Sequence, residues 1–242
     1  MKPDDEANSP RREFLKQAAA IAGVAAVAGT VVAAGDSRTA NAPSEAAPFV
    51  GYEFFGPDEA AFVEALLNVM CPADQYTPNG VDCGLATFFD RQLAGPFGQG
   101  KGRYMRGPWN QGPPEMGSQS PLTPAQFFKA GLIAANDASA HRFGKPFAQL
   151  TSADADALLH DIQDGHVKRG DVPLESWFNS LVYPLFVQAC FSDPLYGGNY
   201  NKVFWKMLGY PGLPATHALD MVQYRGKPYP PAANPKSILD FS

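Results

Sequence analysis

The segment C-F-S-D-P-L-Y-G-G-N-Y-N-K-V-F-W-K-M-L-G, residues 190–209, joins a strongly apolar stretch to a short aromatic helix. Asp193-Pro194 starts a turn, because the proline ring fixes its own φ and biases the preceding residue away from the α region. Gly197-Gly198 permits positive φ or a close backbone approach, and Asn199 tolerates the left-handed region. The pattern predicts a fixed irregular turn; its plainest role is a tight corner between two core helices.

The apolar stretch before this turn, Leu174–Phe191, is expected to form the central buried helix, which Pro184 kinks or divides. Apolar residues at helical spacing and N-terminal signals predict further helices at about 57–70, 84–93, 124–143, 152–164 and 203–208. No alternating strand series and no repeat is present. We therefore predict a mainly α fold: a single helical domain of about five or six helices, with long Gly/Pro-rich loops such as 95–122 and an extended C-terminal tail, 210–242.

The N-terminal region has the pattern of an export signal. Residues 9–16 read S-P-R-R-E-F-L-K, with a twin arginine at Arg11 and Arg12, and a mildly apolar Ala/Gly/Val run follows. Ala40-Asn41-Ala42 supplies small residues at the spacing that a signal peptidase reads. This resembles a twin-arginine (Tat) signal, which is a receptor-read address; a retained transmembrane helix is the alternative. We expect a signal at residues 1–42 and a periplasmic helical domain at residues 43–242.

The charge of the chain bears on its partners. The 242 residues carry a net charge of −5, and the basic residues form no stripe. Nucleic-acid binding depends on such clusters of Lys and Arg, so nucleic acid is excluded as a partner. No second apolar span is present, so we expect the domain to reach a membrane only through other proteins.

Three cysteines are present. Cys71 and Cys83 flank the loop C-P-A-D-Q-Y-T-P-N-G-V-D-C, and in an oxidising periplasm we expect a disulfide between them. Closing this short loop would contribute about 3 kcal/mol. The alternative is two small apolar side chains that do not pair. Cys190 is left over, and its apolar neighbours Phe186 and Phe191 favour a buried thiol over an intermolecular link.

Motifs that would give the chain a chemistry of its own are missing. There is no G-x-S-x-G nucleophile elbow, no C-x-x-C-H haem attachment and no G-x-G-x-x-G after a strand. The four histidines are scattered, without convincing metal-ligand spacing. We therefore expect no catalytic, cofactor or metal site in this chain.

Several aromatic and amide side chains remain as candidates for binding. Tyr196, Asn199 and Trp205 suit a sugar site, because aromatic faces and amides recognise carbohydrates. They suit a protein interface equally well, since Trp and Tyr are favoured there. Trp109 lies in the long Gly/Pro loop, and we expect this loop to pack on a partner.

A set of short motifs resembles one family, subunit 3 (the small or gamma subunit) of membrane-bound, flavin-dependent gluconate 2-dehydrogenase. The resemblance covers about residues 55–212, and any one motif alone would be weak. The motifs are F-G-P-D-E at 55–59, P-A-D at 72–74, F-D-R-Q-L-A-G at 89–95, G-P-W at 107–109, P-E-M-G at 114–117, P-L-T-P at 121–124, D-P-L-Y-G-G-N at 193–199 and W-K at 205–206. The chain departs from the family pattern at Cys71 and Cys83 and in its longer tail from Val222.

The resemblance implies an accessory role. The family's large subunit carries FAD and is of the glucose–methanol–choline type, and a separate c-type cytochrome takes the electrons and holds the complex on the membrane. The small subunit carries the Tat signal, so that the Tat translocase exports the folded flavoprotein with it. Two functions remain open at this point: a non-catalytic subunit of a sugar or sugar-acid dehydrogenase, with Trp109, Tyr196, Asn199 and Trp205 at the partner interface, or a stand-alone exported carbohydrate-binding or hydrolytic domain.

Overall fold

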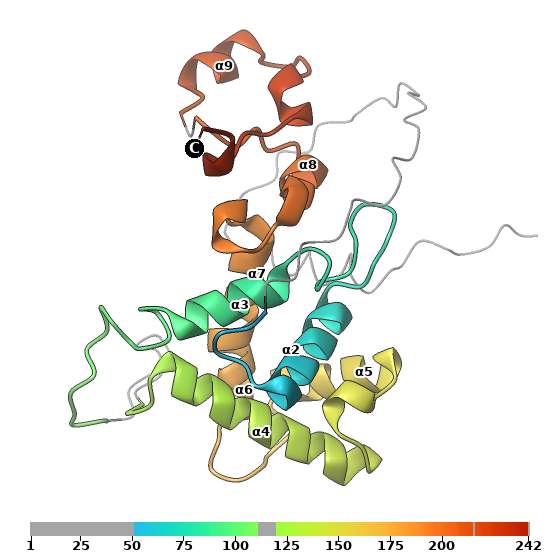
Figure 1. Ribbon diagram of the computed structural model, residues 1–242, viewed down its shortest axis with the longest axis vertical. Helices are drawn as coiled ribbons and strands as arrows, with labels where there is room; N and C mark the ends of the chain where they lie inside the picture. Colours follow the sequence, from blue (N-terminus) through green and yellow to red (C-terminus); the bar gives the residue numbers. More distant parts are fainter. Residues whose placement is uncertain (1–50, 111–119, 215, 242) are drawn as a thin grey trace, which may run out of the picture. The chain divides into compact units, whose positions relative to one another are not determined.

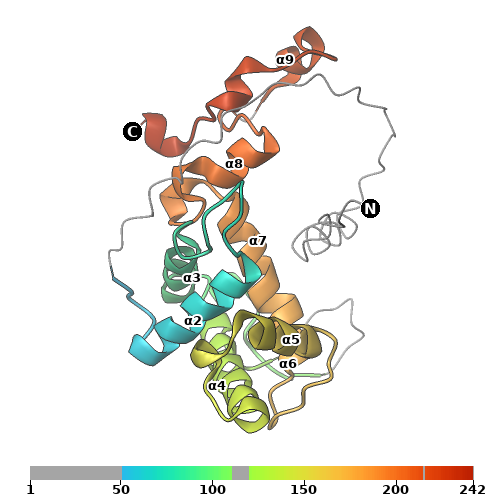
Figure 2. The same ribbon diagram turned by 90° about the vertical axis from the view of Figure 1, so that its right-hand side faces the viewer.

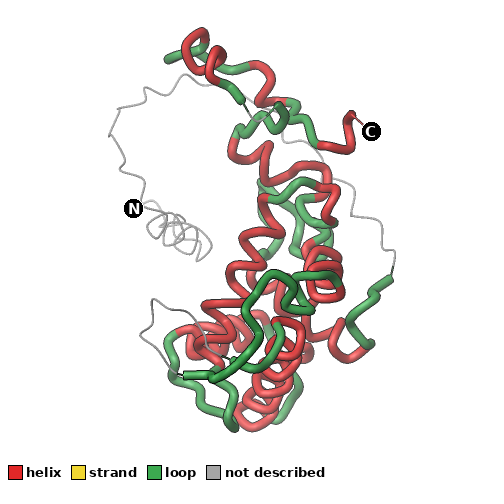
Figure 3. The backbone as a smooth tube through the Cα atoms, turned by 90° about the vertical axis from the view of Figure 1, so that its left-hand side faces the viewer, coloured by secondary structure: helices red, strands yellow, loops and turns green. Residues whose placement is uncertain are grey.

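The computed structural model describes residues 51–110, 120–214 and 216–241, and all of them belong to one compact unit, Pro43–Ser242. Helices and loops make up these ranges, and no strand occurs in them (Figure 3). The predicted mainly α fold is confirmed. The predicted export signal, with Arg11 and Arg12, lies outside the described residues.

The first two helices begin and end where their sequences predict. Helix α2 (Pro57–Met70) has proline in its first turn, and the Glu59 carboxylate accepts the Gly56 N–H at 3.0 Å. Helix α3 (Leu85–Ala94) follows the cysteine-flanked loop and ends at Gly95. Asp90 of α3 is buried and accepts the backbone N–H groups of residues 53–55 at 2.8–3.1 Å, so it fixes the segment that leads into α2.

Helix α4 (Pro124–Phe143) begins with a capping box, within the range predicted for a helix. Thr123 Oγ1 accepts the Gln126 N–H, and Gln126 Oε1 accepts the Thr123 N–H in return. Gly144, with φ of 68°, ends the helix in the left-handed region. Helix α5 (Ser152–Gln163) follows a short 3₁₀ turn, η2 (Phe147–Gln149), and is capped by Thr151.

The central apolar stretch is divided, as Pro184 predicts. It consists of α6 (Leu174–Trp177), a π-helical segment η3 (Phe178–Val182) and α7 (Tyr183–Phe191). Proline has no N–H to donate back to residue 180, and the backbone bonds just before it shift register: the Tyr183 N–H reaches Phe178 O, five residues back. Helix α3 packs along α7, and α4 packs against α6 (Figures 1 and 2).

The core is densest where α6 crosses α4. Trp177 is fully buried, and its Nε1–H donates to Phe128 O at 3.2 Å. Its indole lies directly over Gly131, where an added Cβ would be 2.1 Å from Trp177 Cδ1. Gly131 therefore lets α6 approach α4 closely. The Phe128 ring also contacts Phe55 and Phe89, which joins α4 to the segment before α2 and to α3.

The chain beyond α7 forms short elements. They are the 3₁₀ turns η4 (Pro194–Tyr196) and η5 (Tyr200–Lys202), α8 (Val203–Leu208), α9 (Ala218–Gln223), and the 3₁₀ turns η6 (Pro230–Ala233) and η7 (Ile238–Phe241). The tail predicted to be extended therefore contains a helix and two turns, drawn in red tones in Figure 1.

The crossing of α4 and α6 gives a direct test of the core. Gly131→Ala would add about 1 kcal/mol of helix propensity at a solvent-exposed site. Here the new methyl overlaps a fully buried indole, so we expect the free energy of unfolding to fall by about 2–3 kcal/mol. Urea denaturation followed by circular dichroism measures this change. Trp177→Phe added to Gly131→Ala removes part of the indole, and the double variant should lose less than the sum of the two single changes.

Candidate functional site

The turn between α7 and α8 sits directly on the end of α7. A Cβ added to Gly198 would lie 2.3 Å from Ala189 O, so glycine is required for this close approach. Gly197 has φ of 102°, and Asn199 has φ of 49°. Asp193 Oδ1 accepts the Leu195 N–H at 3.0 Å, which starts the turn as the Asp-Pro pair predicts. The fixed irregular turn expected from the sequence is present.

Asn199 lies inside the fold and not at the surface where a partner would meet it. Its side chain is 0% exposed. Its Nδ2 donates to Ser192 O at 3.1 Å, and its Oδ1 accepts the Phe204 N–H at 3.0 Å. Both ends of the amide are therefore used to join the end of α7 to the start of α8. In the single chain Asn199 serves the turn, and its role at a partner interface stays a prediction.

Trp205 is also internal, at 6% exposed. Its Nε1–H donates to Phe191 O at 2.9 Å, and its ring meets Tyr210 edge-on at 5.2 Å. The interface role expected for Trp205 likewise stays a prediction. Tyr196, Asn199 and Trp205 do not form the sugar site that was considered for them. The polar groups of Asn199 and Trp205 are used in hydrogen bonds within the chain.

Tyr196 does lie at the surface, at 48% exposed, on the rim of a hollow between α3 and α7. We call this hollow the α3–α7 groove; its volume is about 520 Å³, and it is lined by Phe88, Gln92, Val187, Gln188, Phe191, Ser192 and Tyr196. Aromatic and aliphatic side chains form most of its wall. Ser192 Oγ is buried, and it has no hydrogen-bond partner among the residues that the structure describes.

Trp109 lines a different hollow, of about 330 Å³. It is half-buried there beside Tyr104 and Met105, and the wall also includes residues of α4 and η3. This hollow shares no lining residue with the α3–α7 groove. The predicted interface residues thus fall into three settings: Tyr196 on one groove, Trp109 on another, and Asn199 with Trp205 in the interior.

The disulfide expected between Cys71 and Cys83 is absent from the structure. Both residues are buried in the described part of the chain, and both sulfur atoms point toward Pro78 O, at 3.9 Å and 3.5 Å respectively. The spacing that suggested a bridge brings the two thiols to one carbonyl, each as a weak donor, without a disulfide. Cys190 is buried, as its apolar neighbours predicted.

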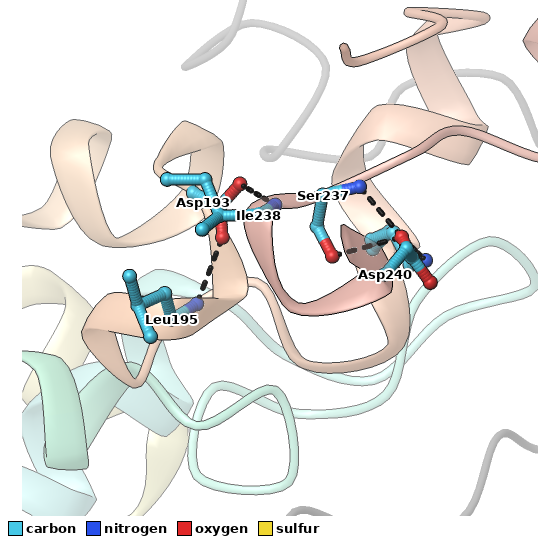
Figure 4. Close-up of polar contacts among 6 residues, drawn as sticks. Asp193, Leu195, Ser237, Ile238 and Asp240 are labelled. Carbon is cyan, nitrogen blue, oxygen red and sulfur yellow. Dashed lines mark hydrogen bonds and ion pairs between the residues drawn. The ribbon is translucent and has the colours of Figure 1, made fainter. Parts of the chain in front are cut away.

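The C-terminal tail is fastened to the turn by two carboxylates (Figure 4). Asp193 Oδ2 accepts the Ile238 N–H at 2.8 Å, 45 residues away. Asp240 Oδ2 pairs with Lys202 Nζ at 2.7 Å and accepts the Ser237 N–H at 2.6 Å. The tail therefore folds back to the turn without a large apolar core of its own.

A small polar cluster stabilises the tail internally. Asp220 Oδ2 accepts the Tyr229 hydroxyl at 2.8 Å and lies 3.1 Å from His217 Nδ1. The Tyr229 and His217 contacts hold the pKa of the Asp220 carboxyl below its usual range. Tyr229 packs edge-on against Tyr224. The aromatic side chains of the tail thus partly cover one another.

No metal centre is evident in the ranges that the structure describes: their His, Cys, Asp and Glu side chains form no group of three or more able to hold an ion. Among the same residues, no helix is both long enough and apolar enough to cross a membrane.

The described residues form a small helical protein with hollows at its surface. The family described as Gluconate 2-dehydrogenase subunit 3 matches residues 57–212, so this chain belongs to that family. The match runs from the first residue of α2 to Gly212 and leaves the tail from residue 213 outside it. Neither the curated proteins nor the solved structures gave a match.

The Asp240 carboxylate makes tail attachment dependent on pH. Lys202, followed by the N–H and hydroxyl of Ser237, lowers the pKa of Asp240 well below its usual range. Because the pKa of Asp240 is lower in the folded chain than in the unfolded one, its contribution to the stability of the attached tail is fully present above about pH 4, the pKa of an unfolded aspartate. That contribution is lost as the pH falls through the folded-state pKa. Exchange of the Ser237 and Ile238 amides, followed by NMR from pH 6 to pH 2 and corrected for intrinsic rates, should show protection falling on the acid side.

The same contact should protect the tail from protease at neutral pH. We expect Asp240→Asn to speed trypsin cleavage after Lys236, because the neutral amide loses the ion pair with Lys202. Asp171→Asn, at an exposed carboxylate that has no ion pair with any described residue, is the matched control. Equal cleavage rates in the two variants would show that Asp240 does not hold the tail.

Proposed function

We propose that this chain is the non-catalytic small subunit of a periplasmic, membrane-associated FAD-dependent sugar or sugar-acid dehydrogenase of the gluconate 2-dehydrogenase type. Family membership over residues 57–212 is the observation that carries the proposal. A subunit of such a complex implies partner subunits. The mainly apolar groove at Tyr196 supports it, because an accessible apolar surface of this kind suits a protein partner.

In this proposal the redox groups reside in other chains. FAD belongs to a large subunit of the glucose–methanol–choline type, and c-type haem belongs to a cytochrome that receives the electrons and holds the complex on the membrane. The present chain binds and stabilises the flavoprotein. The polar side chains of its central turn, Asp193 and Asn199, are engaged in holding backbone together, which is consistent with a supporting role.

The proposal also assigns residues 1–42 as a Tat signal that is removed on export. The Tat route carries folded proteins, so one signal on the small subunit would carry a flavin-loaded partner across with it. The twin arginine at Arg11 and Arg12 is the feature that the translocase would read.

Co-purification tests the accessory role. The tagged full chain, co-expressed with a flavoprotein subunit of the gluconate 2-dehydrogenase type, should retain a yellow partner that oxidises gluconate or a related sugar with an artificial acceptor. The same chain purified alone should be colourless and inactive. Flavin absorbance or turnover in the lone chain would contradict the proposal.

Subcellular fractionation tests the export role separately. Replacing Arg11 and Arg12 by lysine should leave most flavoprotein activity in the cytoplasm, because the paired guanidinium groups that the translocase recognises are gone. Arg38→Lys, a basic residue outside the motif, is the control and should leave the activity in the periplasm. Unchanged periplasmic activity in the twin-lysine variant would remove the Tat assignment.

A further inference from the structure

The turn between α7 and α8 holds three non-glycine residues in the left-handed region of backbone conformation. Asn199, Asn201 and Lys202 have φ of 49°, 53° and 57°. In this region the Cβ of an L-residue comes close to the following carbonyl oxygen, which is unfavourable; asparagine tolerates it better than most residue types, and lysine is an unusual occupant. The left-handed conformation of Lys202 therefore depends on stabilising contacts elsewhere in the chain.

Lys202 differs from Asn199 in where its side-chain contact comes from. The Asn199 amide bonds to Ser192 O and to the Phe204 N–H, both close by in the sequence. The Lys202 side chain instead reaches the C-terminal tail, where its Nζ lies 2.7 Å from Asp240 Oδ2, 38 residues away. This side chain is only 17% exposed, and a lysine so well covered normally has its charge paired.

Asp240 is held in place by the residues just before it. Its Oδ2 also accepts the N–H of Ser237 at 2.6 Å and the Ser237 hydroxyl at 3.0 Å, and Ser237 is 2% exposed. The Ile238 N–H donates to Asp193 Oδ2 at 2.8 Å (Figure 4). The last residues of the tail are therefore attached to the turn at two points, one near its start at Asp193 and one at its end at Lys202.

A closed backbone loop brings these last residues to the turn. The Lys236 N–H donates to Pro211 O at 3.0 Å, and the Leu213 N–H donates to Lys236 O at 2.8 Å. Gly212 is required for this pairing, because its φ is 76° and an added Cβ would lie 2.0 Å from Lys236 O. Residue 236 is thus fixed by backbone bonds of its own, which do not involve the Lys202 ion pair.

We propose that residues 237–241 form a strap that holds Lys202 in the left-handed conformation and so keeps the turn between α7 and α8 rigid. Lys202 directly precedes α8, so its conformation sets where α8 begins. When the strap is detached, the backbone at Lys202 relaxes and Trp205, in the first turn of α8, loses protection. The strap lies beyond Gly212, where the family match ends. It acts within the single chain, so it does not depend on the proposed complex.

Exchange of the Trp205 indole N–H, measured by NMR, tests the strap, because this group bonds to Phe191 O across the turn. Deleting residues 237–242 should speed its exchange by about 5- to 30-fold, the factor that corresponds to the cost of one left-handed residue. The Trp177 indole N–H, bonded to Phe128 O where α6 crosses α4, is an internal control and should exchange at an unchanged rate. Unchanged exchange at Trp205, or equal acceleration of both indoles, would overturn the proposal.

Two substitutions of Lys202 separate the ion pair from the backbone conformation. Lys202→Met and Lys202→Gly both remove the ion pair with Asp240, but only glycine adopts positive φ without steric cost. In the full-length chain, Trp205 indole exchange should therefore be about 5- to 30-fold faster in the methionine variant than in the glycine variant. Equal rates in the two variants would show that the strap does not act on the left-handed backbone.

Deletion of residues 237–242 from the Lys202→Gly chain completes the test. Glycine keeps the left-handed conformation without the strap, so the deletion should change Trp205 indole exchange by less than about twofold. An acceleration as large as the one in the wild-type chain would show that the tail protects the turn without acting through Lys202, and it would contradict the proposal.

Discussion

The side chain of Asn199 holds together the part of the molecule on which the rest depends. One amide joins the last turn of α7 to the first turn of α8, through Ser192 O and the Phe204 N–H. Gly198 makes this possible, since any side chain there would collide with the Ala189 carbonyl. Because the turn is fixed, Trp205 is buried, Tyr196 is set on the rim of the α3–α7 groove, and Asp193 is placed to bind the tail.

The part of the fold that the sequence predicts well is the part that local physics controls. The capping box at Thr123, the proline at the start of α2 and the division of the central helix at Pro184 are encoded within a few residues, and the structure contains all three. The irregular turn was also predictable, because Asp-Pro and Gly-Gly restrict the backbone wherever they occur. None of these signals depends on a distant contact.

The sequence is least informative where distant contacts decide the structure. Asn199 and Trp205 have the composition of an interface, and only the packing of α7 against α8 shows that their polar groups are used internally. The tail is rich in proline and was expected to be extended, yet Ile238 is held by a carboxylate 45 residues away. The buried hydroxyl of Ser192 had no signal in the sequence, because a serine at a helix end is ordinary and its burial is a property of the assembled fold.

In the proposed complex this chain provides a surface that binds the flavoprotein, and the flavoprotein carries out the chemistry. Hydrogen exchange of the full chain, measured with and without the flavoprotein, tests this account most directly. The account predicts that binding protects backbone amides of the helical domain. An exchange pattern that the flavoprotein leaves unchanged throughout this domain would contradict it.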